Sequence, residues 1–326
     1  MFRSAGQINA VGGALAAGVL LVSLISSPRA QAEAVASSAE QLPEVTVNAP
    51  RPPTPQELAG EAVPDFVRVH AKAAIVTGQL ARWSIPICPM TQGLSPAFND
   101  FVSARILAVA ANVGAPHQEG DKCGTRHNVY IFFTSEPKRL LDEVMKKDSR
   151  LLGFHYPSQT RSLQQMSRPI QGWYVTSSRG AWGDQSIDEA EPLLPSERSI
   201  LNRGTHPAGM PDSRLSSHIS SGIVNVLIVA DLSRVVGLEI GPLSDYLAML
   251  TLTQAFASEQ CGTLPSIMDL MAPNCGDREK PTQITAGDLA FLRALYQADL
   301  EAVLPMERSS ISDSMLRAFK ERPSTH

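Results

Sequence analysis

The sequence predicts an α+β domain, and three observations support that class. Hydrophobic residues make up 43% of the 326-residue chain, which is enough for a sizeable core. Short apolar or aromatic runs with the character of strands are interspersed with longer segments of helical spacing. The main predicted elements follow the order strand, helix, strand, strand, helix, helix, which is typical of helices packed on a mixed sheet.

The first 32 residues have the composition of a secretory signal peptide. Arg3 gives a weakly cationic start, residues 14–25 are apolar and uncharged, and Ala30 and Ala32 are the small residues that a signal peptidase reads. A membrane-spanning helix needs about 20 apolar residues, and this run is shorter. We therefore expect a periplasmic or secreted protein, cleaved near Ala32, with no membrane span in the mature chain.

The remaining chain divides by composition. Residues 33–62 hold five prolines among Ala, Ser, Glu and Thr, which is typical of an extended or disordered linker. We expect a single domain over residues 63–302. Within it, residues 177–211 are rich in Gly, Ser, Asp, Arg and Pro and indicate a mobile surface insertion. Residues 303–326 are expected to form a C-terminal tail, with a weakly amphipathic helix at 308–320.

The first half of the domain contains four predicted elements. Residues 82–88 (RWSIPIC) read as a short strand, and Pro86 suits an edge position because it cannot donate a ladder hydrogen bond. Residues 95–113 have helical apolar spacing and begin with a Ser-Pro pair that suits a helix start. Residues 129–134 (VYIFFT) predict a buried strand. Residues 136–147 predict a charged amphipathic helix.

The second half contains the most apolar segment outside the N-terminal leader, residues 223–240. Its β-branched content would allow a strand, but its length favours a long buried helix. Gly241 and Pro242 would then end that helix. We also expect strands at 170–176 and 213–220 and a helix at 243–256.

The four cysteines fit an oxidising compartment, where an even number favours disulfides. Four cysteines allow three pairings. We favour Cys88 with Cys123 and Cys261 with Cys275, because each pair brackets a local unit. A metal site is the rival interpretation, but no CxxC spacing occurs and no histidine lies close to Cys261 or Cys275.

The charge balance bears on partners. The formal net charge is -4, and the sequence shows no cluster of Lys and Arg. Affinity for phosphate backbones depends on such clusters, so nucleic acid is excluded as an attractive partner, and anionic membranes are disfavoured for the same reason. We expect the partner to be an unknown protein or peptide.

Three segments, taken in order, resemble the metzincin branch of zinc metalloproteases. In that family one helix carries HExxHxxGxxH, whose histidines bind zinc and whose Glu is the general base. Residues 230–240 can be aligned with this motif, with Asp231 at the Glu position and Gly237 at the glycine. None of the residues at the three histidine positions can bind zinc. These residues are Ala230, Arg234 and Ile240.

Two further segments extend the resemblance to residues 223–298. Met268, in the sequence Ser-Ile-Met, is similar to the methionine of the Met-turn that lies under the metal in that family. The segment from Thr285 resembles the closing helix, and Thr285 and Asp288 have the spacing of a capping box. The resemblance implies a zincin-like fold without zinc or another cofactor, as in uncharacterised secreted bacterial families with this ligand-poor ending.

The charged residues of the altered motif suggest a hypothesis. An Asp-x-x-Arg pair lies in an otherwise apolar segment. This motivates the hypothesis that Arg234, held by the carboxylate of Asp231 or Glu239, replaces the positive charge of the metal. The alternative is an ordinary ion pair between Asp231 and Arg234 at a partly exposed helix edge.

Other catalytic patterns are sparse. Ser135 and Lys138 match SxxK, the acylating pair of penicillin-binding enzymes, but the companion motifs SDN and KTG are absent. Ser135 is also explained as the N-cap of the following helix. The seven histidines form no HxH, HxxxH or HxxE pair.

The sequence thus predicts a non-catalytic exported domain that binds a protein or peptide through the groove of a protease-like fold, or has a structural role in the cell envelope. The alternative is a hydrolase with Ser135 and Lys138 as its catalytic residues. A third hypothesis is a zinc enzyme that uses histidines from separate loops.

Overall fold

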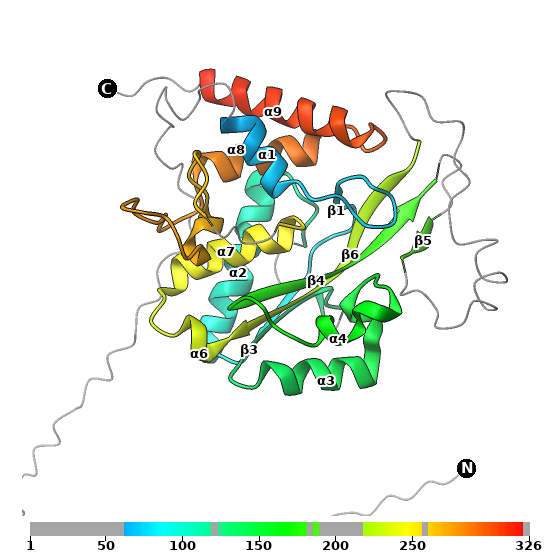
Figure 1. Ribbon diagram of the computed structural model, residues 1–326, viewed down its shortest axis with the longest axis vertical. Coiled ribbons are helices and arrows are strands. Elements are labelled where there is room, and N and C mark those ends of the chain that lie inside the picture. The colour runs from blue at the N-terminus through cyan, green and yellow to red at the C-terminus, as the bar shows by residue number, and fades with distance from the viewer. Residues whose placement is uncertain are drawn as a thin grey trace, which may run out of the picture. The chain divides into compact units, whose positions relative to one another are not determined.

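The computed structural model describes residues 62–118, 123–124, 126–180, 185–188, 218–255 and 260–321. The predicted signal peptide and almost all of the predicted linker lie outside these residues, as does most of the predicted insertion at 177–211. Figure 1 shows the described elements as a sheet with helices on both faces. The α+β class with a mixed sheet is therefore confirmed.

The sheet is built around β6 (Ser220–Asp231), which has neighbours on both sides. In the described part of the chain, the strand order is β2-β3-β6-β4-β5, and β1 also pairs with β6. β1, β2 and β3 run parallel to their neighbours, whereas β4 runs antiparallel to β6 and β5. The other strands are β1 (Ala81–Trp83), β2 (Pro89–Gln92), β3 (Val129–Thr134), β4 (Ile170–Arg179) and β5 (Gln185–Ile187).

The long buried helix predicted for residues 223–240 is wrong. The first half of that segment is the end of the strand β6, followed by the one-turn helix α6 (Leu232–Val235). A strand with partners on both sides and helices on both faces is apolar on both of its own faces, so it shows no alternation. Gly241 and Pro242 lie in the first turn of α7 (Ile240–Leu252), where the missing amide of proline costs no hydrogen bond.

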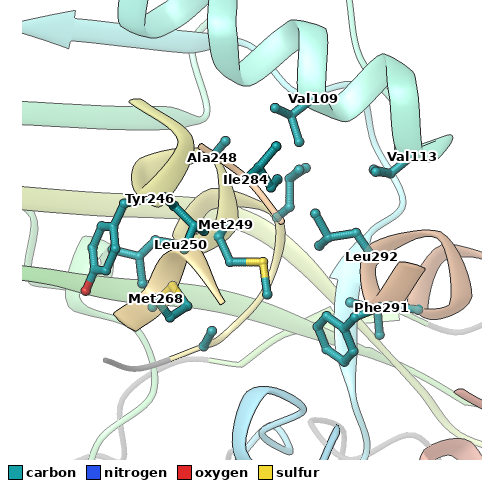
Figure 2. Close-up of a cluster of buried hydrophobic side chains, with 14 of the residues drawn as sticks. Val109, Val113, Tyr246, Ala248, Met249, Leu250, Met268, Ile284, Phe291 and Leu292 are labelled. Atoms are coloured by element: carbon teal, nitrogen blue, oxygen red, sulfur yellow. The ribbon is translucent and has the colours of Figure 1, made fainter. Parts of the chain in front are cut away.

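One face of the sheet carries the main core. Side chains of β3 and β6 that alternate toward this face, such as Ile131 and Ile228, are fully buried. Helices packed on this core include α1 (Ala62–His70), α2 (Pro96–Val113), α7, α8 (Ala286–Gln297) and α9 (Leu304–Lys320). Figure 2 shows how α2, α7 and α8 meet in this core.

The C-terminal helix belongs to that core. Ile311, Met315 and Phe319 of α9 are buried with it, so residues 304–320 are part of the folded unit and not a separate tail. Glu307 anchors the helix by accepting a hydrogen bond from the Leu80 amide at 3.0 Å.

The opposite face of the sheet has a thinner cover. Its small core contains Trp173 and Leu227 from the sheet and Leu141 from α3 (Pro137–Asp148). Short turns complete this layer; they are η2 (Ser149–Leu152), η3 (Pro157–Gln159) and α4 (Thr160–Leu163). Among the described residues, no helix is both long and apolar enough to cross a membrane.

Both predicted disulfides are confirmed. Cys88 is joined to Cys123, and Cys261 is joined to Cys275, with Cα–Cα distances of 5.6 Å and 4.9 Å. The second bridge closes a loop that follows α7 and contains the turn η4 (Ile267–Met271).

Other differences from the predicted elements are local. The predicted strand 82–88 is interrupted, because β1 ends at Trp83 and β2 begins only at Pro89. The start of the predicted insertion is regular structure, since β4 runs on to Arg179 and pairs with β5. The predicted strand 213–220 lies mostly outside the described residues. Helix α3 starts from an N-cap at Glu136, so Ser135 is not its cap.

Candidate functional site

The six positions of the altered zinc motif and its Met-turn do not come together on one helix. Ala230 is buried in β6, and Asp231 is the last residue of that strand. Arg234 is exposed in α6, and Ile240 is the first residue of α7. Gly237 turns the chain between these two helices with a φ of 87°, which favours glycine.

The charge-replacement hypothesis for Arg234 is wrong. The side chain of Arg234 is exposed to solvent, and within the described residues no ion pair joins it to Asp231 or Glu239. Asp231 instead caps α6, where its carboxylate accepts hydrogen bonds from the amide and hydroxyl of Ser233 at 3.0 and 2.6 Å.

Met268 lies in the core beneath a helix, but that helix is α7. Figure 2 shows Met268 next to Tyr246, Met249 and Leu250, all of them buried. The phenol of Tyr246 is buried, which raises its pKa above the ordinary value and keeps it protonated. The side chains that α7 presents to Met268 therefore form hydrophobic packing.

Asp288 joins the turn that contains Met268 to the closing helix α8. Its carboxylate is fully buried and accepts hydrogen bonds from the Ser266 hydroxyl at 2.6 Å and the Ile267 amide at 2.8 Å. It also accepts the amide and hydroxyl of Thr285, which completes the predicted capping box. Burial raises the pKa of Asp288, while these hydrogen bonds oppose that shift.

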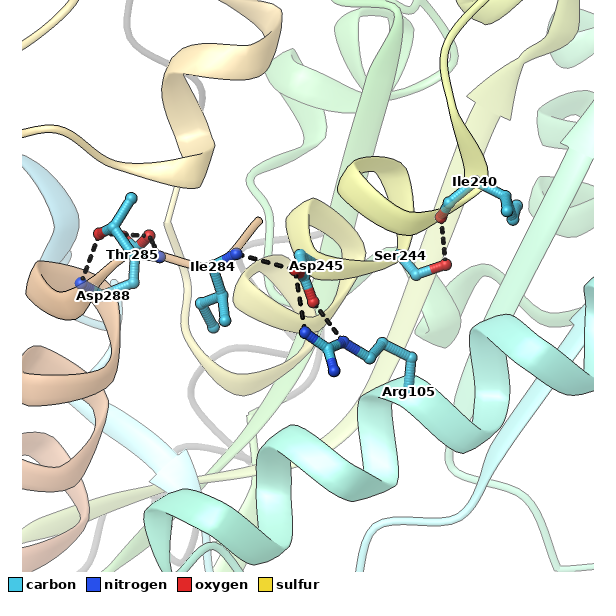
Figure 3. Close-up of polar contacts among 7 residues, drawn as sticks. All are labelled: Arg105, Ile240, Ser244, Asp245, Ile284, Thr285 and Asp288. Carbon is cyan, nitrogen blue, oxygen red and sulfur yellow. Dashed lines mark hydrogen bonds and ion pairs between the residues drawn. The ribbon is translucent and has the colours of Figure 1, made fainter. Parts of the chain in front are cut away.

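Helix α7 contributes a second buried carboxylate, that of Asp245. Arg105 of α2 binds Asp245 through two nitrogens at 2.5 and 3.1 Å, and Asp245 also accepts the Ile284 amide at 2.8 Å (Figure 3). This junction ties α2, α7 and the entry to α8 together, and it has a structural role.

The candidate site is a cavity between α1 and the disulfide-closed loop. Its volume is about 180 Å³. It is lined by Ala62, Asp65, Phe66, Val69, His70, Gln260, Cys261, Gly262, Thr263, Leu264 and Asp269. None of the altered motif positions lines it. We call this space the α1 cavity.

His70 is the most unusual residue of the α1 cavity. Its side chain is 6% exposed, and its ring packs on Phe66 with centroids 4.2 Å apart. Nδ1 lies 2.9 Å from the carbonyl oxygen of Phe66, so Nδ1 carries the proton and donates. Burial lowers the pKa of His70, although the nearby carboxylate of Asp288 opposes the shift. The ring is thus neutral near pH 7.

Asp269 adds a buried acid to the same cavity. Its side chain is 3% exposed and accepts a hydrogen bond from the Ser266 amide at 3.1 Å. Burial raises the pKa of Asp269 to about 6, so the group is mostly ionised at neutral pH. Perturbed acids and bases that line a cavity mark a candidate site, because burial and neighbouring charges are how proteins tune binding groups.

Ser135 and Lys138 lie on the other side of the sheet, at the start of α3. Both residues are exposed, and Lys138 Nζ bonds the Asp142 carboxylate on the next turn at 2.7 Å. Across the described parts of the chain, no group of three or more His, Cys, Asp and Glu side chains is placed to hold a metal ion.

Sequence reasoning missed the α1 cavity. The spacing of Val63, Phe66, Val67 and His70 indicates one apolar helix face, but the histidine itself carries no motif. Asp269 stands next to the predicted Met268, yet only the fold brings it beside α1. No family model, curated protein or solved structure matches this chain.

Proposed function

We propose that the chain is a non-catalytic domain that acts outside the cytoplasm and recognises a protein or peptide. It takes one side chain of that partner into the α1 cavity. The observation that carries this proposal is the cavity itself, whose lining combines buried polar side chains such as His70 and Asp269 with apolar ones such as Phe66 and Leu264.

The size of the α1 cavity supports a side chain as its occupant. Pockets for drug-sized ligands have volumes of about 300–1,000 Å³. A volume of about 180 Å³ is too small for such a molecule, but it accommodates a single extended side chain.

The region around Met268 supports the non-catalytic part of the proposal. A zincin-like protease would place its metal ligands on the helix above this methionine, and α7 places Tyr246, Met249 and Leu250 there. The two disulfides support a location outside the cytoplasm, since such bridges persist in oxidising compartments. The relation to zincin-like families remains a proposal.

Binding of model peptides to the purified chain tests the function. The panel consists of blocked pentapeptides Ac-Ala-Ala-X-Ala-Ala-NH2, with X set to Leu, Phe, Glu, Gln, Lys or Arg, measured by isothermal titration calorimetry and NMR. We expect saturable binding of at least one peptide.

The matched variants are Val69→Phe, which fills the cavity from its half-exposed wall, and Ser310→Phe, which adds the same ring on the exposed face of α9. Val69→Phe should abolish binding and Ser310→Phe should retain it. If no peptide binds, or if both variants bind equally well, the proposal is overturned.

A further inference from the structure

We propose that the α1 cavity is specific for the positively charged side chain of lysine or arginine in a bound peptide. This inference rests on the proposed function, since it names the side chain that the cavity takes. Three features of the cavity wall lead to it, and together they involve α1 and the disulfide-closed loop.

The first feature is a hydrogen-bond acceptor on His70. Because Nδ1 donates to the Phe66 carbonyl, the neutral ring presents a lone pair at Nε2. Among the described residues no donor is bonded to this nitrogen, and His70 is a wall of the cavity. A side chain that is more than nine-tenths buried therefore offers an acceptor to an occupant that carries N–H groups.

The second feature is the charge of the wall. Asp65 and Asp269 line the cavity, and among the described residues that line it there is no Lys or Arg. A carboxylate with little solvent around it favours a cationic donor, because charge-assisted hydrogen bonds are about twice as strong as neutral ones.

The third feature is the apolar remainder of the wall. Phe66, Val69 and Leu264 provide apolar surface for a hydrocarbon stem. Lysine and arginine combine such a stem with a charged end that needs polar partners. The wall of the α1 cavity has the same two parts.

Two arginines of the chain lie near the α1 cavity, but neither places its guanidinium in it. Arg68 pairs with Asp65, but both side chains are about half exposed or more, at 66% and 48%, so the pair is weak. Arg278 donates to the carbonyl of Gly262 from an exposed position. Neither side chain lines the cavity. From its exposed position Arg278 favours the charged form of Asp269, and among the described residues no donor is bonded to Nε2 of His70.

The test compares charged peptides with neutral peptides of the same shape. Pentapeptides Ac-Ala-Ala-X-Ala-Ala-NH2 with X as arginine or lysine are titrated into the purified chain beside those with citrulline or norleucine. We expect the charged peptides to bind about tenfold or more tightly than their neutral counterparts. Asp269→Asn should remove most of that difference while the neutral peptides bind as before.

Asp65→Asn gives a second variant at a half-exposed position, where misfolding is not expected, and it should reduce the preference for charge by a smaller factor. Circular dichroism and thermal unfolding of each variant show that the fold is retained. Equal binding of charged and neutral peptides would overturn the inference while the proposed function stands. If the parent chain binds neither the charged nor the neutral peptides, the inference and the proposed function are both overturned.

A last arm separates a peptide side chain from a free amine. Putrescine and n-butylamine carry the same charged group without a peptide backbone. We expect them to bind at least tenfold more weakly than the lysine peptide, since they lack the neighbouring backbone contacts. If putrescine binds more tightly than the peptide, a free organic cation is the ligand and the peptide assignment is overturned.

Discussion

The buried carboxylates of Asp245 and Asp288 are stabilised by different kinds of partner (Figure 3). Asp245 faces the guanidinium of Arg105, a full opposite charge, and accepts one amide. Within the described residues, the donors to Asp288 are hydroxyl and amide groups of Ser266, Ile267 and Thr285. Both are at most 2% exposed.

The difference teaches where the chain can tolerate a change of protonation. An acid paired with a buried guanidinium must stay charged, because neutralising it leaves the other charge uncompensated. An acid held by neutral donors can take up a proton at a smaller cost, and burial moves the pKa of Asp288 upward in that direction. Asp288 lies next to the candidate site, whereas Asp245 lies away from it.

The largest effect is expected from breaking the charged junction. Arg105→Met leaves the carboxylate of Asp245 buried without its cation, and we expect the free energy of unfolding to fall by about 3–5 kcal/mol. Urea denaturation followed by circular dichroism measures this loss. The double variant Arg105→Met with Asp245→Leu should recover much of it, because no buried charge then remains. If the double variant is as unstable as the single one, packing and not charge explains the effect.

A smaller loss is expected at the neutral junction. Asp288→Asn keeps the shape of the side chain but turns an NH2 group toward donors such as the Ile267 amide. We expect the free energy of unfolding to fall by about 1–3 kcal/mol, in the range for an unsatisfied buried donor. The same urea denaturation provides the comparison. A loss larger than that of Arg105→Met would reverse our ranking of the two junctions.

The raised pKa of Glu307, another buried acid, leads us to expect that the stability of the fold depends on pH. Burial raises the pKa of Glu307 to about 7, whereas an unfolded Glu titrates near 4.3. Between these two values the folded state binds more protons than the unfolded state, so stability falls as pH rises from about 4.5 to 7.5. Asp269, with a pKa raised to about 6, contributes in the same direction.

Glu307→Gln isolates that contribution, because glutamine retains the acceptor for the Leu80 amide and cannot ionise. We expect its melting temperature to fall less than that of the parent chain between pH 5 and 8. His70 acts in the opposite sense below its unfolded pKa, since burial lowers its pKa, but it is present in both proteins. Parallel pH profiles of the two proteins would show that Glu307 does not titrate in this range.

The smallest effect is expected on the exposed side of α3. Lys138 pairs with Asp142 at 2.7 Å, but the lysine side chain is 78% exposed. Lys138→Ala should change the free energy of unfolding by less than about 0.5 kcal/mol, as is usual for a surface ion pair. A loss near that of Asp288→Asn would show that exposed and buried ion pairs are not as different here as the structure indicates.

Elements with a clear local pattern could be predicted from the sequence. The strand at 129–134 and the helix at 95–113 have the apolar spacing of their class and match β3 and α2. The capping box of Thr285 and Asp288 depends on residues three apart, which any helix start brings together. The region around β6 could not be read in this way, because a strand bonded on both sides has no face that needs polar residues.

By itself, the sequence determined the α+β class, the bridge between Cys261 and Cys275 and the helix start at Thr285, because each depends on composition or on residues near in the chain. It also favoured Cys88 with Cys123, 35 positions apart, because that pair brackets a local unit. Only the tertiary structure decided that residues 220–231 form a strand, since its hydrogen bonds come from β3 and β4. The fold also decided the candidate site. It brings His70 of α1 beside Asp269 of η4, about 200 positions away in the chain, and burial then lowers the pKa of His70 and raises that of Asp269.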